Sequence, residues 1–420
     1  MRAKALIFDE LRQDRCTAHA VKGRCYYSIV SLADAIKRTA LEVGFDLAGI
    51  APISAWQDLE FAHDWVEKGY GGEMAYLKNP KRRDPRLILS SAQSVICVGL
   101  VYNAPLPYST EVCSGCTDTT GPDDGARGWI SRYAWSRDYH EAMRERLERL
   151  RAAVERFAPE VETRVYVDTG PIVERAFARL SGIGWVGKNT CLINQEKGSW
   201  IFLGVIITSL ELDPEVPAFD RCGSCTRCLE ACPTGALTEP YVMDASRCIA
   251  YLNIELKGSI PERFRAAIGA NVLGCDICQD VCPWNRASGQ TADSSRRKPA
   301  TTTLAEFEPL TIEPAPAPQD IDTQAEWRDT HREPRSFSLF HPRLADLSSL
   351  KEDQFQRVFA RSPIKRVKYR GWLRNLCVVI GNSGDAQFVP WLREMIRHED
   401  ALVREHAEWA LRRLERSASS

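Results

Sequence analysis

The sequence predicts a mixed α/β protein built from a layered α/β domain, a cysteine-rich module and a short helical region. Three observations carry this prediction. Helical periodicity alternates with short apolar runs up to about residue 215, eight cysteines gather between residues 222 and 282, and two amphipathic stretches lie near the end. At 420 residues the chain is long enough for two to four domains.

The composition is ordinary for a water-soluble protein, with 44% hydrophobic and 26% charged residues and a formal net charge of −1. No apolar run approaches the roughly 18 residues that a membrane span needs, and the first residues lack a signal-peptide pattern. Because the thiols must stay reduced, we expect a cytoplasmic protein that meets no membrane. The balanced charge argues against a surface coated with nucleic acid. Residues 361–374 nevertheless hold six basic residues and no acidic one.

Residues 29–215 predict the α/β domain, after an extension of residues 1–28 to which we assign no function. Ser31 is placed to cap the first helix, and Gly44 to end it. Further helices are predicted over residues 61–68, 139–157 and 172–180, and strands over residues 47–50, 94–101, 164–167, 190–193 and 200–208. The pattern does not fix the order of the strands.

The cysteines form two runs. The first is Cys222, Cys225, Cys228 and Cys232, and the second is Cys275, Cys278 and Cys282, each followed at once by proline. The gaps of two, two and three residues in the first run are those of bacterial ferredoxins, whose thiolates hold a [4Fe-4S] cluster. Cys248 is the only other cysteine between the runs. It supplies an eighth ligand, so the count closes at two clusters and predicts electron transfer.

In paired-cluster ferredoxins the fourth cysteine of each run binds the other cluster. The expected ligand sets are Cys222, Cys225, Cys228 and Cys282 for one cluster, and Cys232, Cys248, Cys275 and Cys278 for the other. Structural zinc is the alternative, but zinc sites rarely place four cysteines within eleven residues. A disulfide framework is less favoured still, since a chain of this size does not need one. The ferredoxin-like domain is expected over residues 216–290.

Three further motifs each have more than one interpretation. Gly182–Gly187 match the dinucleotide pattern G-x-G-x-x-G but follow a helix, so the glycines are better explained by close approach of the backbone to another group. Asp168 ends a strand, where capping a turn is favoured over acting as a general acid. For Cys113 and Cys116, a tolerated loop insertion is favoured over a redox dithiol or a third metal site.

The last third of the chain divides into a connecting segment and a helical region. A Pro-, Thr- and Ser-rich stretch predicts that residues 291–360 connect the ferredoxin-like domain to the helical region. Residues 388–397 and 402–414 predict two short helices like one HEAT repeat, within a domain of residues 361–420. The basic run of residues 361–374 is either a solvated face or a phosphate-binding one, with Tyr369 and Trp372 raising the second to equal weight.

Several runs together resemble epoxyqueuosine reductases. They are residues 167–171 (VDTGP), 182–189 (GIGWVGKN), the first cysteine run, 248–251 (CIAY), 254–258 (IELKG) and 274–285 (GCDICQDVCPWN). The resemblance extends from about residue 31 to the C-terminal helices. It implies a cobalamin-dependent oxidoreductase that reduces epoxyqueuosine to queuosine at the wobble position of tRNA, the last step of queuosine biosynthesis. The implied architecture is a cobalamin-binding α/β domain of the nitroreductase and reductive-dehalogenase type, a domain with two [4Fe-4S] clusters, and a HEAT-like domain that helps to hold tRNA.

The resemblance also implies roles for single residues. Asp168 becomes the proton donor, which reverses the preference for a turn cap, and its pKa should be raised above ~3.9 by burial. The implied cobalamin contacts are Arg82, Ser131, Asp168, Gly187, Lys188, Asn189 and Asp276. The expected tRNA contacts are the basic residues Lys365, Arg366, Lys368, Arg370 and Arg374.

Three other functions stay open. A corrinoid reductive dehalogenase acting on a small molecule would share the clusters but would leave the basic residues without a role. A plain iron-sulfur electron-transfer subunit would bind no corrinoid, and a tRNA-binding scaffold would show no turnover. The expected partners are a tRNA carrying epoxyqueuosine and an external one-electron donor of the flavodoxin or ferredoxin type, and we expect a monomer.

Overall fold

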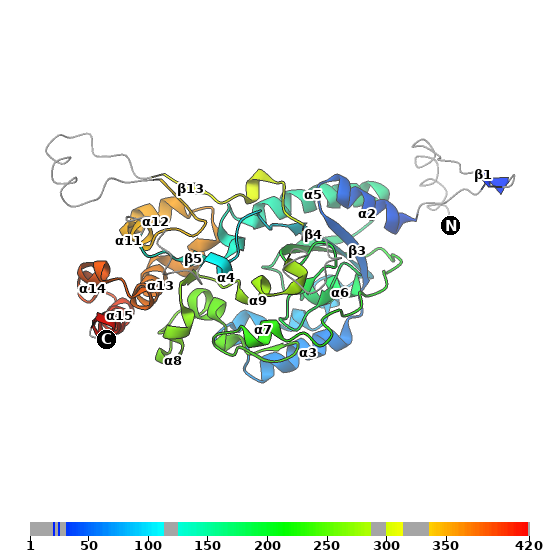
Figure 1. Cartoon of the computed structure of the whole chain (residues 1–420). Coiled ribbons are helices and arrows are strands. Elements are labelled where there is room, and N and C mark those ends of the chain that lie inside the picture. Colours follow the sequence, from blue (N-terminus) through cyan, green and yellow to red (C-terminus); the bar gives the residue numbers. More distant parts are fainter. Residues whose placement is uncertain are drawn as a thin grey trace.

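The computed structural model describes residues 31–112, 125–286, 300–313 and 336–418, together with two short strands, β1 (Ala20–Val21) and β2 (Arg24–Cys25). The loop of Cys113 and Cys116 and much of the expected linker lie outside the described residues. Figure 1 shows the sheet and its helices at one end of the molecule and helices α11 to α15 at the other, with the cysteine-rich module between them. None of the described helices is long and apolar enough to cross a membrane.

Four antiparallel strands form the sheet of the N-terminal domain, in the order β3-β4-β9-β6. They are β3 (Leu47–Pro52), β4 (Ser94–Val101), β9 (Ile201–Thr208) and β6 (Thr163–Tyr166). Every residue of β4 is buried. Because successive side chains of a strand point to opposite faces, Ile96 and Val98 enter one apolar core while Val95 and Cys97 enter another.

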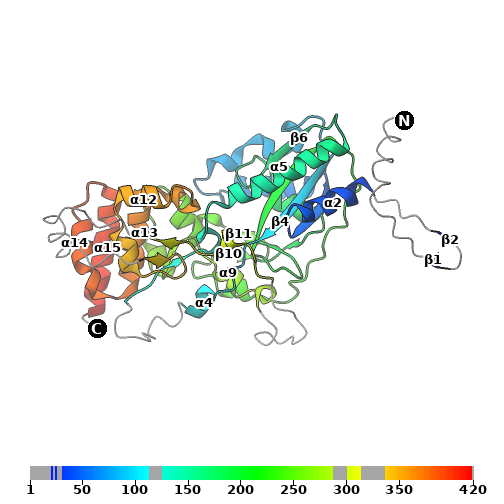
Figure 2. The same ribbon diagram turned by 90° about the horizontal axis from the view of Figure 1, so that it is seen from above.

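Helices cover both faces of this sheet, which explains why β4 is apolar without alternation. One face carries α2 (Leu32–Glu42) and α5 (Tyr139–Phe157), which lie together in Figure 2. The other carries α3 (Trp56–Glu67) and α6 (Glu174–Leu180). The expected cap of α2 is confirmed, since the Ser31 side chain accepts a hydrogen bond from the Asp34 amide. The sheet with helices on both faces therefore matches the expected layered α/β domain.

Some elements differ from the sequence prediction. Helix α3 begins five residues before residue 61, and this extra turn buries Leu59 against the sheet. The strand expected at residues 190–193 shortens to β8 (Leu192–Ile193), which pairs with β7 (Trp185–Val186) as a small hairpin. The G-x-G-x-x-G segment thus lies at this hairpin and opens no helix.

The cysteine-rich module is made of short elements. They are α7 (Arg227–Glu230), β10 (Leu237–Glu239), β11 (Val242–Met243), a π-helical turn (Tyr251–Glu255), α8 (Glu262–Arg265), β12 (Asn271–Leu273) and α9 (Ile277–Asp280). Each cysteine run contains one short helix, and α7 contacts α9. Strand β12 pairs in parallel with β5 (Trp129–Ile130), which joins the module to the segment before α5.

The C-terminal region is helical from residue 344 onwards. Its helices are α11 (Leu344–Ser349), α12 (Glu352–Val358), α13 (Lys368–Ser383), α14 (Val389–Met395) and α15 (Ala401–Ala418). Two small strands, β13 (Thr311–Ile312) and β14 (Phe337–Ser338), pair before them, and α4 (Ser109–Val112) lies near α9. The end of the expected linker is therefore folded, because Leu347 and Phe355 pack in one apolar core with Trp372 of α13.

Candidate active site and cysteine sites

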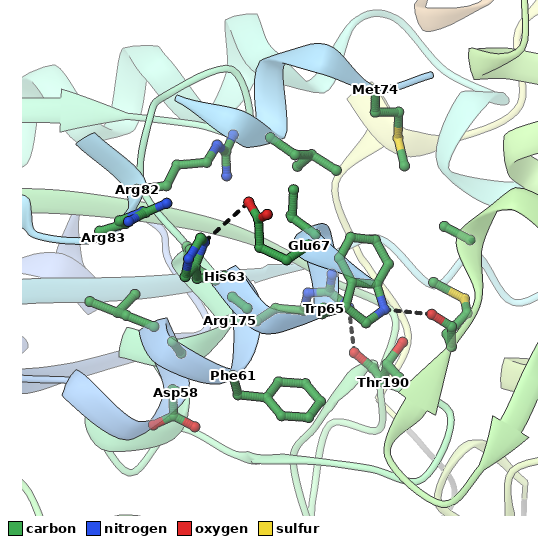
Figure 3. A pocket seen from close by; sticks show the side chains of 18 of the residues that line it. Asp58, Phe61, His63, Trp65, Glu67, Met74, Arg82, Arg83, Arg175 and Thr190 are labelled. Atoms are coloured by element: carbon green, nitrogen blue, oxygen red, sulfur yellow. Dashed lines mark hydrogen bonds and ion pairs between the residues drawn. The ribbon is translucent and has the colours of Figure 1, made fainter. Parts of the chain in front are cut away.

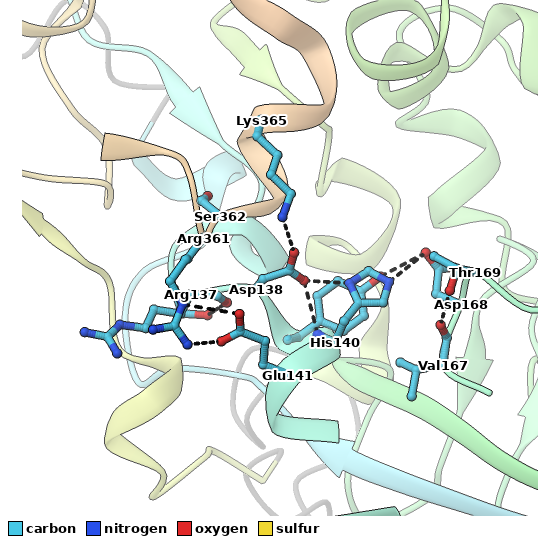
Figure 4. Close-up of polar contacts among 12 residues, drawn as sticks. Arg137, Asp138, His140, Glu141, Val167, Asp168, Thr169, Arg361, Ser362 and Lys365 are labelled. Carbon is cyan, nitrogen blue, oxygen red and sulfur yellow. Dashed lines mark hydrogen bonds and ion pairs between the residues drawn. The ribbon is translucent and has the colours of Figure 1, made fainter. Parts of the chain in front are cut away.

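Asp168 lies where the chain leaves β6, in the loop before α6. Its φ of +53° is in the left-handed region, which costs a residue with a Cβ roughly 1–2 kcal/mol. Its Oδ2 accepts a hydrogen bond from the Tyr139 hydroxyl at 3.0 Å and lies 3.6 Å from Nε2 of His140. Both partners belong to the first turn of α5, and Figure 4 shows His140 facing this loop. The expected proton donor is therefore held by two polar side chains of another element.

Arg82 holds the same loop from the opposite direction. Its guanidinium donates to the carbonyl oxygens of Gly170 at 3.0 Å and Ile172 at 3.1 Å. A Cβ at position 170 would lie 2.4 Å from the ring of Tyr166, so only glycine fits there. The structure thus brings together Arg82 and the Asp168 loop, which lie more than 80 residues apart in the chain.

His140 carries the proton of this network. Burial opposes its protonation, but the hydrogen bond with Asp138 and the ion pair with Asp168 outweigh burial and raise its pKa from 6.5 to about 9. The ion pair with His140 is also the main cause that lowers the pKa of Asp168, against the effect of burial, and the Tyr139 hydrogen bond adds to it. The expected rise in the pKa of Asp168 is therefore wrong, because the cationic neighbour His140 favours the ionised carboxylate and was not foreseen from the sequence.

The sequence analysis did not single out Tyr139 or His140. The side chain of Asp138 accepts from the His140 amide and caps α5, a role that an aspartate before an amphipathic helix does signal. Its second role, as the ion-pair partner of His140 at 2.6 Å, depends on a side-chain direction that spacing does not reveal. The contact between His140 and Asp168 joins α5 to the loop after β6, so spacing within one element does not reveal it either.

Replacing Asp138 with asparagine should lower the pKa of His140 from about 9 towards its ordinary 6.5. Because folding raises the pKa of His140, its protonation stabilises the folded protein. This stabilisation is fully present below about pH 6.5 and is lost as the pH rises through about 9. The pH dependence of the His140 imidazole signals in NMR spectra measures the shift. Glu141→Gln is the matched control, because Glu141 pairs with Arg361 and not with His140. An unchanged pKa in D138N would contradict this assignment.

A cavity of about 570 Å³ lies beside the loop that Arg82 holds. Its walls come from α3, residues 74–83, α6 and β11, as Figure 3 shows in part. Phe61, Trp65 and Met74 make it largely apolar, and its cationic lining residues include Arg82, Arg83, Arg175 and Arg179. The Arg82 Nε atom is buried without a hydrogen-bond partner. A cavity of this size and lining suits a large apolar group that carries an anionic arm.

The other residues expected around a corrinoid do not line this cavity. Ser131 and Asp276 are buried, and the Ser131 hydroxyl donates a hydrogen bond to the Asp276 carboxylate. Asp276 also accepts hydrogen bonds from the Trp129 indole at 2.9 Å and the Arg132 backbone amide at 2.8 Å. The segment of Gly187, Lys188 and Asn189 contacts the cysteine runs. The side-chain amide of Asn189 donates a hydrogen bond to the Cys278 carbonyl at 3.2 Å. Val186 and Thr190, which flank this segment, do line the 570 Å³ cavity.

The first expected ligand set surrounds one small cavity of about 60 Å³. Its lining includes Cys222, Cys225, Cys228 and Cys282, with Lys188 and Trp284. Cys282 belongs to the second run, so the chain crosses between the two runs as the ferredoxin pattern predicts. We call these four cysteines set A.

The second expected set, Cys232, Cys248, Cys275 and Cys278, is set B. Burial is the main cause that raises the pKa of the Cys275 thiol, and Cys248 and Cys232 lie close enough to raise it further. Among the described residues, no three His, Cys, Asp or Glu side chains are placed to hold one metal ion.

The basic run divides between surface and interior. Lys365 pairs with Asp138 at 3.1 Å, so the run adjoins the Asp168 network (Figure 4). Arg366 and Arg370 form exposed ion pairs with Glu255 and Asp400, and Lys368 is exposed at the start of α13.

Arg374, an expected tRNA contact, is buried, so that expectation is wrong for this residue. Its guanidinium donates to the carbonyl oxygens of Leu252, Leu256 and Gly258. Trp372 is buried as well. Arg374 therefore fastens α13 to the cysteine-rich module, where no phosphate reaches it.

Replacing Arg374 with methionine should lower the free energy of unfolding by about 3 kcal/mol, because several buried carbonyl oxygens lose their donor. Denaturant unfolding followed by circular dichroism measures the change. Arg370→Met is the matched control, since Arg370 lies one turn earlier and its ion pair with Asp400 is exposed; it should cost less than about 1 kcal/mol. Equal stability of the two variants would contradict the role of Arg374.

Two segments of the chain match family models. Residues 82–169, which include both Arg82 and Asp168, match the model of epoxyqueuosine reductase QueG. Residues 221–285, which contain sets A and B, match the 4Fe-4S double cluster binding domain. The two models thus cover the loop of the candidate active site and the cysteine module.

Known proteins resemble the chain over most of its length. Epoxyqueuosine reductase of Salmonella typhimurium is 36% identical over 384 residues, which cover 90% of this chain and 88% of that protein. Two solved structures are each 27% identical, cover 91% of this chain and 90% of their own, and have a TM-score of 0.72. One is epoxyqueuosine reductase from Bacillus subtilis with its catalytic aspartate loop swung out of the active site, and the other is an epoxyqueuosine reductase with an epoxyqueuosine-modified tRNA stem loop. The chain therefore belongs to the epoxyqueuosine reductase family.

Proposed function

We propose that this oxidoreductase reduces epoxyqueuosine to queuosine at the wobble position of tRNA, the last step of queuosine biosynthesis, with Asp168 as the proton donor. The observation that carries the proposal is the Asp168 loop itself. It joins an acid-base network to a large cavity and lies in the same protein as two sets of four cysteines. A solved relative with a modified tRNA stem loop supports the substrate.

The proton chemistry follows from the network. Converting an epoxide to an alkene consumes two electrons and two protons and releases water. At neutral pH the transferable proton resides on His140, and Asp168 is ionised. The Asp168 side chain is half exposed before substrate binds. Once an anticodon covers it, loss of water disfavours the ion pair. The proton then moves from the imidazolium to the carboxyl, which donates it to the oxygen released from the epoxide.

The cofactor assignments follow the two kinds of cavity. Sets A and B would each hold one [4Fe-4S] cluster, in keeping with the double-cluster model over residues 221–285. Cobalamin would occupy the 570 Å³ cavity, with the guanidinium groups of Arg82 and Arg175 near its anionic arm. When bound, its cobalt would store electrons that the clusters deliver one at a time. Arg82 would keep the Asp168 loop in place at the edge of that cavity.

The tRNA would contact the exposed basic residues. Lys365, Arg366, Lys368 and Arg370 lie on one short stretch near the Asp168 network, and phosphate contacts of this kind weaken with salt. We assign α14 and α15, which contact each other, to one HEAT-like repeat beside this surface. Because its substrate is tRNA and its thiols must stay reduced, we place the protein in the cytoplasm, as a monomer that receives electrons from a flavodoxin or ferredoxin.

One assay tests the proposal. Anaerobically reconstituted protein should hold about eight irons, retain cobalamin, and convert epoxyqueuosine in tRNA to queuosine, as nucleoside mass spectrometry detects. A reductive dehalogenase would not bind tRNA in a salt-sensitive way, and an electron-transfer subunit would not retain cobalamin. Absence of queuosine from reduced protein that holds both cofactors would leave a tRNA-binding scaffold and reject the proposal.

A further inference from the structure

Lys188 is a buried cation against the loop of set A. Its side chain comes from the β7–β8 hairpin of the α/β domain. Its ammonium donates to the carbonyl oxygens of Gly223 at 2.6 Å and Cys225 at 3.1 Å, within the first cysteine run. It also lines the 60 Å³ cavity that the four cysteines of set A surround. Lys188 does not line the 570 Å³ cavity.

We propose that Lys188 raises the reduction potential of the cluster on set A and leaves the cluster on set B unchanged. An electron added to an iron-sulfur cluster adds one negative charge, and a nearby positive charge stabilises the reduced form. The effect is large only where water does not screen it. Lys188 meets this condition because its side chain is buried and its ammonium is directed at the cluster loop by two carbonyl oxygens.

The charges around the two sets differ. Near set A, the acidic residues are Asp220, which accepts from the Cys222 backbone amide, and Glu230, within the first run. Both are exposed, so water screens their charges. Next to set B, Asp276 is buried between Cys275 and Cys278 and interacts electrostatically with the buried guanidinium of Arg132. These opposite charges offset each other. Lys188 interacts electrostatically with Asp220 as well, but Asp220 is exposed, so its carboxylate offsets the buried cation at set A less than Arg132 offsets Asp276.

The difference has a consequence for the direction of electron flow. The residues between the cysteines of the first run, such as Gly223 and Arg227, are exposed, whereas Gly274 and Asp276 beside Cys275 are buried. An external donor therefore reaches set A first. A raised potential at the exposed cluster favours acceptance of the first electron from a weak donor.

Redox titration followed by electron paramagnetic resonance tests the proposal on reconstituted protein. In K188M one of the two midpoint potentials should shift to a lower value and the other should stay, with about eight irons retained. K188R keeps the positive charge and should restore most of the shift. Lys197→Met is the matched control, because Lys197 lies just beyond the same hairpin but pairs with Asp46; its two potentials should equal those of the unchanged protein.

Two results would overturn the proposal. The first is that K188M keeps both clusters with both potentials unshifted. The second is that both K188M and K188R lose half of the iron, which would make Lys188 only an anchor of the loop. The proposal rests on the two-cluster part of the proposed function. It does not depend on turnover, so a failure to form queuosine with normal clusters would reject the enzyme assignment and leave the measured potentials valid.

Discussion

Replacing Asp168 with asparagine is expected to lower the rate of epoxyqueuosine reduction by at least about a hundredfold, the range in which a lost general acid is felt. Asparagine keeps the volume of the side chain and accepts the Tyr139 hydrogen bond, but it donates no acidic proton. It also removes the negative charge that faces His140 at 3.6 Å. Single-turnover assays on modified tRNA, with queuosine measured by mass spectrometry, give the rate.

The effect must be separated from loss of cofactors. The absorption spectrum and iron content of D168N should match those of the unchanged protein, because Asp168 lies outside both cysteine sets and outside the lining of the 570 Å³ cavity. Tyr139→Phe is the matched control within the network, since it removes one donor and leaves the carboxyl. Its rate should fall by far less. Unchanged epoxide reduction in D168N would remove Asp168 from the mechanism.

Local patterns predicted the α/β domain well where they were long. The apolar run of β4 and the regular periodicity of α5 gave both elements residue for residue, because eight or more residues define a period clearly. Of the β7–β8 hairpin, β7 was missed and β8 was expected as a longer strand, because each of these strands has only two residues. The strand order β3-β4-β9-β6 needed the structure, since it depends on contacts between distant segments.

The same limit applies to the candidate site. Cysteine spacing anticipated the crossed grouping of set A, because ligand geometry restricts the gaps between residues. No comparable rule restricts where charged side chains lie, so the sequence does not tell which of them are buried. Arg374 and Arg370 look alike in the basic run, yet Arg374 bonds carbonyl oxygens 116 to 122 residues away and Arg370 is exposed. Lys188 and His140 likewise acquire their partners only when distant elements meet.

Replacing Cys248 with alanine should remove one cluster, so that the iron content falls from about eight to about four per chain. Cys248 is the ligand that the count requires but that neither run contains. It lies just before the π-helical turn Tyr251–Glu255, and it contributes to the electrostatic surroundings of Cys275 and Cys278 in set B. Iron analysis and electron paramagnetic resonance of the reduced protein measure the loss, and turnover should fall to background because the proposed delivery of electrons uses both clusters.

The control is a cysteine that lies close to set B but belongs to neither ligand set. Cys191 serves, because its thiol interacts with that of Cys278 although Cys191 belongs to neither set. C191S should therefore keep about eight irons and both resonance signals. Eight irons in C248A together with a loss in C191S would exchange the two residues and show that the eighth ligand comes from the α/β domain. That outcome would place the second cluster across the boundary between the two domains, and the spacing rule would then have identified the correct number of ligands with one wrong member.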